Sequence, residues 1–142
     1  RDIEARREVG LIDEASRSRQ MEERQIEKQK ILDLLFQFHL LPESYPTSAA
    51  NLPELTGELH NAIAGFLAST PSQLMVLNQE DLFKDGEQQN LPGTTHQYPN
   101  WRHKMKFRVE ELRQSRQACD YTRMFRNWMA ATGRLRTGQG SV

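Results

Sequence analysis

The sequence predicts a mainly α-helical chain with three to four helices and at most one short strand. Apolar residues recur at helical spacing in three stretches, at about residues 13–41, 51–69 and 109–131. Only one short apolar run, residues 74–77, lacks that spacing, and polar stretches rich in Gly and Pro separate the segments. With 142 residues, the chain holds one modest domain at most.

Composition excludes several classes of protein. The single cysteine, Cys119, rules out a disulfide scaffold. No apolar run approaches the roughly 18 residues that a membrane span needs, and residues 1–10 lack the apolar stretch of a signal peptide, so we expect a cytoplasmic location. Because the first residue is Arg rather than Met, we also expect a piece of a longer parent protein.

The charges cancel overall but are unevenly distributed. Residues 1–36 carry 8 basic and 9 acidic groups, residues 37–100 carry one basic and seven acidic groups, and residues 101–142 carry 10 basic and 3 acidic groups. The basic last third can pack over the acidic middle, remain solvated, or meet an acidic partner such as nucleic acid. Charge runs usually serve solubility, so we favour an internal or solvated role over nucleic-acid binding.

The first predicted helix covers about residues 13–41, which contain no Gly or Pro. Its second half carries an apolar stripe at positions i, i+3, i+4, i+7 and i+10, formed by Ile31, Leu34, Leu35, Phe38 and Leu41. Its first half is mostly charged, so we expect a solvated or frayed helix there. Pro42 ends the helix, and residues 41–53, with three prolines, are expected to form a surface loop.

The second predicted helix begins at Asn51, with Glu54 completing a capping box, and ends near Ser69. Its apolar face consists of Leu52, Leu55, Leu59, Ile63 and Phe66. The run that follows, residues 74–77, is typical of a strand buried on both sides. A lone strand must pair with something absent from this chain, pair with a copy of itself, or not form a strand here.

The third predicted helix covers about residues 109–131 and ends at Gly133. Its apolar stripe consists of Ala118, Tyr121, Phe125 and Trp128, which we interpret as core or interface rather than as a platform for stacked bases. We expect the residues beyond Gly133 to be disordered.

Most residues with reactive side chains have a structural interpretation. His39 and His60 lie in apolar helical segments with no second ligand at metal-binding spacing. Cys119 has basic neighbours but no partner His. The paired acids at residues 13–14, 22–23 and 110–111 are interpreted as solvated helix surface. No metal site and no cofactor site is predicted.

The long polar loop at residues 84–100 and the residues just after it favour a function. Within it, the segment NLPGT, residues 90–94, combines a rigid proline, a glycine and polar side chains, and HQYPNWR, residues 96–102, adds Tyr and Trp rings beside polar groups. Flat apolar faces mixed with hydrogen-bonding groups suit a neutral polyhydroxylated ligand such as a sugar. In a (β/α)₈ barrel, loops that follow strands build the active site.

This loop resembles the signature near the C-terminus of the 4-α-glucanotransferases, the amylomaltases or disproportionating enzymes of glycoside hydrolase family 77. Three other segments resemble the family as well: residues 1–11 follow its Thr-His-Asp-Leu-Pro motif, residues 66–72 match its seventh barrel helix, and residues 77–82 match its eighth strand and Glu-Asp-Leu turn. The resemblance implies that residues 1–112 are the C-terminal part of a TIM barrel, with its last strand and active-site loop. Residues 113–142 would be a basic helical extension and disordered tail.

The resemblance implies transfer of α-1,4-glucan segments between malto-oligosaccharides by a retaining double displacement. The family's catalytic carboxylates lie upstream of Arg1, so no catalytic residue is assigned here and the chain alone is expected to be inactive. Two groups of loop residues follow from the resemblance. The substrate-binding group is Asn90, Pro92, Gly93, Thr94, His96, Tyr98 and Trp101, and the loop-structuring group is Asn100 and Arg102.

The expected ligand is a malto-oligosaccharide or glucan, bound in the parent protein. The isolated chain is expected to associate with itself, because an incomplete core exposes apolar faces. The alternative is a small helical protein-interaction or nucleic-acid-binding module that uses the basic tail. Affinity for nucleic acid that falls steeply with added salt would favour that alternative.

Overall fold

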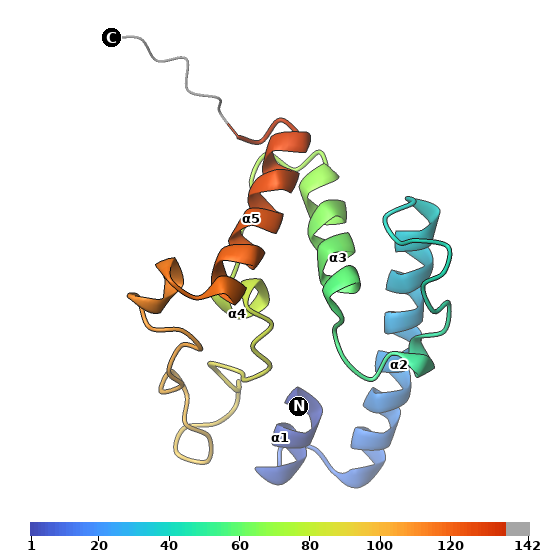
Figure 1. The fold of residues 1–142 in the computed structure, drawn as a ribbon. Helices are drawn as coiled ribbons and strands as arrows, with labels where there is room; N and C mark the ends of the chain where they lie inside the picture. The colour runs from blue at the N-terminus through green and yellow to red at the C-terminus, as the bar shows by residue number, and fades with distance from the viewer. Residues whose placement is uncertain (136–142) are drawn as a thin grey trace.

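The computed structural model describes residues 1–135, and within them the chain is helical, as the sequence predicted (Figure 1). The expectation of disorder beyond Gly133 falls mostly on residues 136–142, which lie outside the described residues. The described residues form five α-helices and two 3₁₀ turns: α1 (Asp2–Glu8), α2 (Glu14–Gln37), η1 (Ala49–Asn51), α3 (Gly57–Ser69), α4 (Gln79–Leu82), η2 (Glu111–Arg113) and α5 (Arg116–Ala131).

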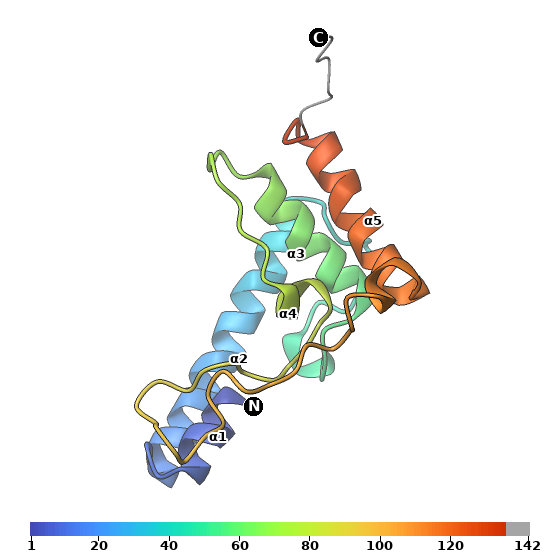
Figure 2. The ribbon, with the colours of Figure 1, turned by 90° about the vertical axis from the view of Figure 1, so that its left-hand side faces the viewer.

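The three long helices lie side by side, with α3 between α2 and α5 (Figures 1 and 2). The short helix α1 packs against the N-terminal half of α2. That contact is polar: Arg17 donates to Glu4 at 2.9 Å and Arg24 donates to Asp2 at 2.9 Å. The described part contains no helix with the length and apolar character needed to span a membrane.

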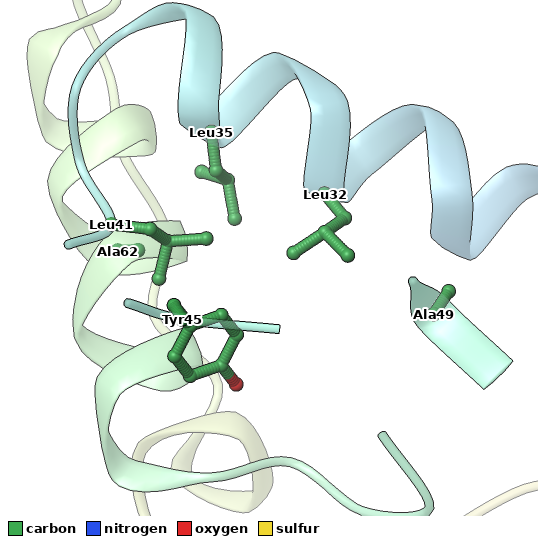
Figure 3. Close-up of a cluster of buried hydrophobic side chains, with 6 residues drawn as sticks. All are labelled: Leu32, Leu35, Leu41, Tyr45, Ala49 and Ala62. Atoms are coloured by element: carbon green, nitrogen blue, oxygen red, sulfur yellow. The ribbon is translucent and has the colours of Figure 1, made fainter. Parts of the chain in front are cut away.

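The main core lies between α2, the loop that follows it and α3 (Figure 3). Its buried side chains are Leu32, Leu35, Leu41, Tyr45, Ala49 and Ala62. The loop is fixed across α2 because Gln29 Oε1 accepts from the Ala49 N–H at 2.9 Å and the Tyr45 hydroxyl shares a hydrogen bond of 2.7 Å with Thr56.

The buried face of α2 differs from the predicted stripe. Leu32 and Leu35 are buried, whereas Ile31 and Phe38 are exposed. Leu32, Leu35 and Phe36 also have helical spacing, and the loop from Leu40 onward folds back over their side of the helix. The stripe prediction was therefore confirmed at Leu35 and Leu41, which are buried, and wrong at Ile31 and Phe38, because the loop decides which face of the helix is covered.

The start of α3 also differs from the prediction. Asn51 ends the 3₁₀ turn η1, and α3 begins six residues later at Gly57, where the Thr56 hydroxyl caps it by accepting from the Leu59 N–H at 3.2 Å. Pro53 falls within the predicted first turn, and the structure keeps residues 52–56 outside any helix.

Residues 73–78 do not form a strand in this structure. Leu74 is 86% exposed and Val76 is 83% exposed, so the run is not buried on either side. A strand needs a neighbour to satisfy its backbone groups, and no strand occurs among residues 1–135. The sequence had left three possibilities for this run: pairing with something absent from this chain, pairing with a second copy, or not forming a strand. In the structure of the single chain the run forms no strand and is an extended segment.

The last helix, α5, begins at Arg116 rather than near Val109. Ser115 caps it, with its hydroxyl accepting from the Ala118 N–H at 3.4 Å, and residues 109–115 hold the separate turn η2. Its packing partner is α3, against which it places Trp128 and the buried Phe125.

Candidate functional site

The candidate site is the loop of residues 88–102, which runs from the end of α4 toward α1 and then returns toward η2 (Figures 1 and 2). Two contacts connect this part of the chain to the N-terminal segment. Arg1 forms an ion pair with Glu87, and a Cβ placed on Gly93 would lie 3.3 Å from a methyl group of Leu11.

Asn100 holds the turn at residues 91–94 in place. Its side-chain oxygen accepts from the Leu91 N–H at 2.7 Å, and its amide nitrogen donates to the Thr94 hydroxyl at 2.8 Å. The Thr94 hydroxyl donates in turn to the Leu91 carbonyl at 2.7 Å. Leu91 is buried and Gly93 has a φ of 87°, a conformation in which glycine carries no steric penalty. The turn is therefore fixed from both sides.

Tyr98 and Trp101 fix the second half of the loop onto its first residues. The Tyr98 hydroxyl donates to the Gln88 carbonyl at 2.9 Å, and the Trp101 N–H donates to the Gln89 carbonyl at 2.6 Å. Trp101 has a positive φ of 59°, which is uncommon outside glycine, and its side chain is 74% exposed. The loop thus presents an indole to solvent from a constrained backbone.

The other predicted residues are not drawn into this network through their side chains. Asn90 is half-buried, while Pro92, His96 and Arg102 are exposed. Within residues 1–135, the side chains of Asn90, His96 and Arg102 make no hydrogen bond or ion pair. Of the cavities found among residues 1–135, those of about 740, 510 and 270 Å³ are lined by residues outside the loop, and Gln89 of the loop lines one of about 10 Å³, which is too small for a sugar.

Sequence reasoning missed one side chain in this region. His103 packs against Tyr98 with ring centroids 5.5 Å apart, and its Nε2 is buried with no hydrogen-bond partner among the described residues. It lies just outside the quoted motif, so the motif gave no signal for it.

Among the residues given a structural interpretation, His60 has the most unusual surroundings. It is 5% exposed, and its ring packs edge-on against Tyr121 and Phe125 at centroid distances of 5.4 and 5.8 Å. Burial lowers the pKa of the His60 imidazole below its usual value. Among the described residues, no group of three or more His, Cys, Asp or Glu side chains is arranged to hold a metal ion.

Comparison with known proteins identifies relatives of one kind. A sequence model of the 4-alpha-glucanotransferase family matches residues 12–111, which include the whole loop and end before α5. The chain is 29% identical over 101 residues to a 4-alpha-glucanotransferase of Haemophilus influenzae, covering 71% of this chain and 14% of that protein. Over 41 residues it is 46% identical to the 4-alpha-glucanotransferases of Mycobacterium bovis and Mycobacterium tuberculosis, covering 29% of this chain and 6% of theirs. The chain thus spans only a small part of these relatives.

Proposed function

The chain belongs to the 4-alpha-glucanotransferase family, and from this membership we propose that it is the C-terminal part of a larger enzyme of that kind. The family match over residues 12–111 carries the proposal. The relatives are about seven times longer than the matched segment, since the chain covers 14% of the Haemophilus protein. In the parent, this chain would complete a (β/α)₈ barrel.

The proposed reaction cleaves an α-1,4 bond of a malto-oligosaccharide and transfers the glucanosyl group to the 4-hydroxyl of another glucan. One carboxylate attacks the anomeric carbon, forming a glycosyl-enzyme and releasing the leaving sugar, which takes a proton from a second carboxylic acid. That second group then removes the proton from the acceptor hydroxyl as the new bond forms. Both carboxylates would come from the rest of the parent, about 5 Å apart as retaining enzymes require.

In this proposal the loop contributes to sugar binding. Asn90 would hydrogen-bond a sugar hydroxyl close to the cleaved bond, because its side-chain amide has no partner within the described chain. The residue directly precedes the buried Leu91, which fixes its position. Pro92, Gly93 and Thr94 would shape the turn. Trp101, with its exposed indole, would offer a flat apolar face to a sugar ring, with His96 and Tyr98 beside it.

We further propose that the isolated chain is catalytically inactive and associates with itself. It would hold only its share of the catalytic cleft, and without the rest of the parent its apolar segment at residues 73–78 stays exposed. Exposed apolar segments of extended chain favour association.

The test uses the full-length parent and the 142-residue chain, assayed for glucose release from maltotriose. We expect activity in the parent and none in the chain alone. Asn90→Ala in the parent should lower kcat/KM about tenfold, since a net hydrogen bond of about 1.4 kcal/mol corresponds to a factor of ten.

Asn51→Ala is the matched control, because Asn51 is an exposed asparagine outside the loop. It should leave kcat/KM unchanged. Full activity of the Asn90→Ala parent would eliminate the role given to Asn90, and a parent without transferase activity would eliminate the proposed function as a whole.

A further inference from the structure

A second concave surface lies along α5, on the side that faces α3 and the solvent. Its volume is about 510 Å³. The lining residues are Asn61 of α3 and, from α5, Asp120, Arg123, Met124, Asn127, Trp128 and Ala131. The α5 residues repeat at intervals of three and four, so they form one stripe about 16 Å long at a helical rise of about 1.5 Å per residue.

The indole of Trp128 is held in a fixed orientation in this groove. Its Nε1–H donates to the Asn61 side-chain oxygen at 2.9 Å. Its ring lies so close to Gly65 that a Cβ there would be 2.6 Å from the ring. Trp128 is only half-buried, so part of the ring borders the groove. The groove therefore contains a rigid aromatic surface of the kind that packs against the apolar face of a sugar ring.

The polar groups of the groove are complementary to hydroxyl groups and carry little net charge. Arg123 donates to Asp120 at 3.0 Å, so the guanidinium and the carboxylate compensate each other. The Asn127 amide makes no hydrogen bond within the described residues, and the Asn61 amide nitrogen is likewise unpaired there. A mixed set of donors and acceptors without net charge suits a neutral ligand better than a phosphate backbone.

We propose that this groove is a second glucan-binding site, distinct from the loop of residues 88–102. The proposal rests on the proposed function, which supplies glucan as the ligand class. It goes beyond the family match, because that match ends at residue 111 and α5 begins at Arg116. The C-terminal half of α5 points away from the loop, which extends toward α1 (Figures 1 and 2). The site would hold one part of a long glucan while another part reaches the cleft.

The experiment titrates the 142-residue chain with maltoheptaose and follows tryptophan fluorescence, with calorimetry as a second readout. The chain has two tryptophans, so Trp101→Phe makes Trp128 the only fluorescent reporter. We expect a saturable change in this background. Arg123→Ala and Asn127→Ala, both at exposed positions, should each raise the Kd about fivefold, as expected for the loss of one hydrogen bond.

Arg126→Ala is the matched control, because Arg126 is exposed on the same helix and does not line the groove. It should bind maltoheptaose with the wild-type Kd, and circular dichroism should show the same helix content for all variants. The proposal is overturned if neither tryptophan fluorescence nor calorimetry responds to maltoheptaose in the Trp101→Phe background. So would a Kd that Arg123→Ala and Asn127→Ala leave unchanged.

Two further outcomes distinguish a wrong ligand class from a failure of the proposed function. If an oligonucleotide binds in the groove with a steep salt dependence and maltoheptaose does not, the ligand class is wrong and the proposal fails. The proposed function is tested separately by transferase activity of the full-length parent. A parent that is active while the groove binds no glucan would reject only the second site.

Discussion

Gly65 is a point of close approach between α3 and the Trp128 ring of α5. Its conformation is ordinary for a helix, so glycine is needed there for space and not for a left-handed backbone. A Cβ at this position would lie 2.6 to 2.8 Å from three atoms of the Trp128 ring. The ring cannot move away freely, because its N–H is bonded to Asn61.

Gly65→Ala should therefore destabilise the chain. We expect a loss of about 1–3 kcal/mol, the usual cost of overpacking, and a Tm lower by several degrees in thermal unfolding followed by circular dichroism. Gly57→Ala is the matched control, since nothing lies within 4 Å of a Cβ placed there, and it should melt at or slightly above the wild-type temperature. A Gly65→Ala variant with the wild-type Tm would contradict the packing of α5 on α3 described above.

The pair of helices α3 and α5 encloses a histidine without a hydrogen-bond partner. Both ring nitrogens of His60 are buried and unpaired within the described residues, and the rings of Tyr121 and Phe125 pack against it. Two neighbours act on its pKa in opposite directions: Asp81 of α4 raises it, and Lys84, the residue after the C-cap of α4, lowers it. Burial is the largest effect and lowers the pKa of His60, so folding disfavours the protonated ring.

This arrangement predicts a pH-dependent stability. In the unfolded chain the His60 imidazole binds a proton near pH 6.5, whereas in the folded chain it binds one only at lower pH. The free energy of unfolding is therefore highest above about pH 6.5 and falls as the pH drops below that value. The slope should reach at most about 1.4 kcal/mol per pH unit. Urea unfolding at pH 7.5, 6.5 and 5.5 measures it.

His60→Phe, which keeps an aromatic ring in place, should flatten that slope, whereas His96→Gln in the exposed loop should keep it. The carboxylates of Asp2, Glu4 and Asp13 affect stability in a lower pH range than His60 does. Ion pairing and hydrogen bonding lower the pKa of Asp2, Glu4 and Asp13, so their contribution to stability is lost only below about pH 4.5. An unchanged slope in His60→Phe would assign the pH dependence to other groups.

At the level of elements, the sequence predicted the three long helices, the ends of α3 at Ser69 and of α5 at Ala131, but not the starts of those two helices or the full buried face of α2. Periodicity located α2, yet both Leu32–Leu35 and Ile31–Phe38 fit a helical stripe, and only the returning loop selects the first. Likewise, Asn51 and Thr56 both suit a helix cap, and the helix forms after Thr56, beyond Pro53. Boundaries and faces depend on tertiary contacts that spacing alone does not contain.

The same limit applies to the site. The composition of residues 90–102 was enough to single out the loop, but the hydrogen bonds that hold it join residues up to twelve positions apart, such as Asn100 to Leu91 and Trp101 to Gln89. The groove on α5 needs Asn61, which is 67 residues from Trp128 in the sequence. The helical spacing of Trp128 favoured a core position, and only the packed structure shows that its ring also borders a cavity.

At the scale of the whole molecule, the segregated charges do not lead to ion pairing between the acidic middle and the basic last third among residues 1–135. Within residues 101–135, the ion pairs of Arg116 and Arg123 are both with Asp120 of the same helix. Arg134 instead donates to the carbonyls of Ala68, Thr70 and Ser72 at 2.6 to 2.8 Å, which caps the C-terminus of α3. The basic side chains Lys106 and Arg134 thus bind backbone carbonyls of the body rather than its acidic side chains.

The exposed run at residues 73–78 is the feature of the whole molecule that most calls for a partner. It contains no charged residue and no proline, and the structure gives the backbone groups of residues 73–77 no hydrogen-bond partner among residues 1–135. Such segments pair edge to edge when nothing covers them. In the isolated chain, the available partner is the same segment of a second copy.

We therefore expect the isolated chain to self-associate with rising concentration in sedimentation velocity experiments. Leu74→Lys should weaken the association at least tenfold, because it puts a charge into the apolar run, and lysine on an exposed edge opposes strand pairing. Gln73→Lys adds the same charge at the polar neighbouring position and should associate nearly as the wild type does. A wild-type chain that stays monomeric at every concentration, or a Leu74→Lys variant that associates equally well, would show that this segment does not mediate contact between copies.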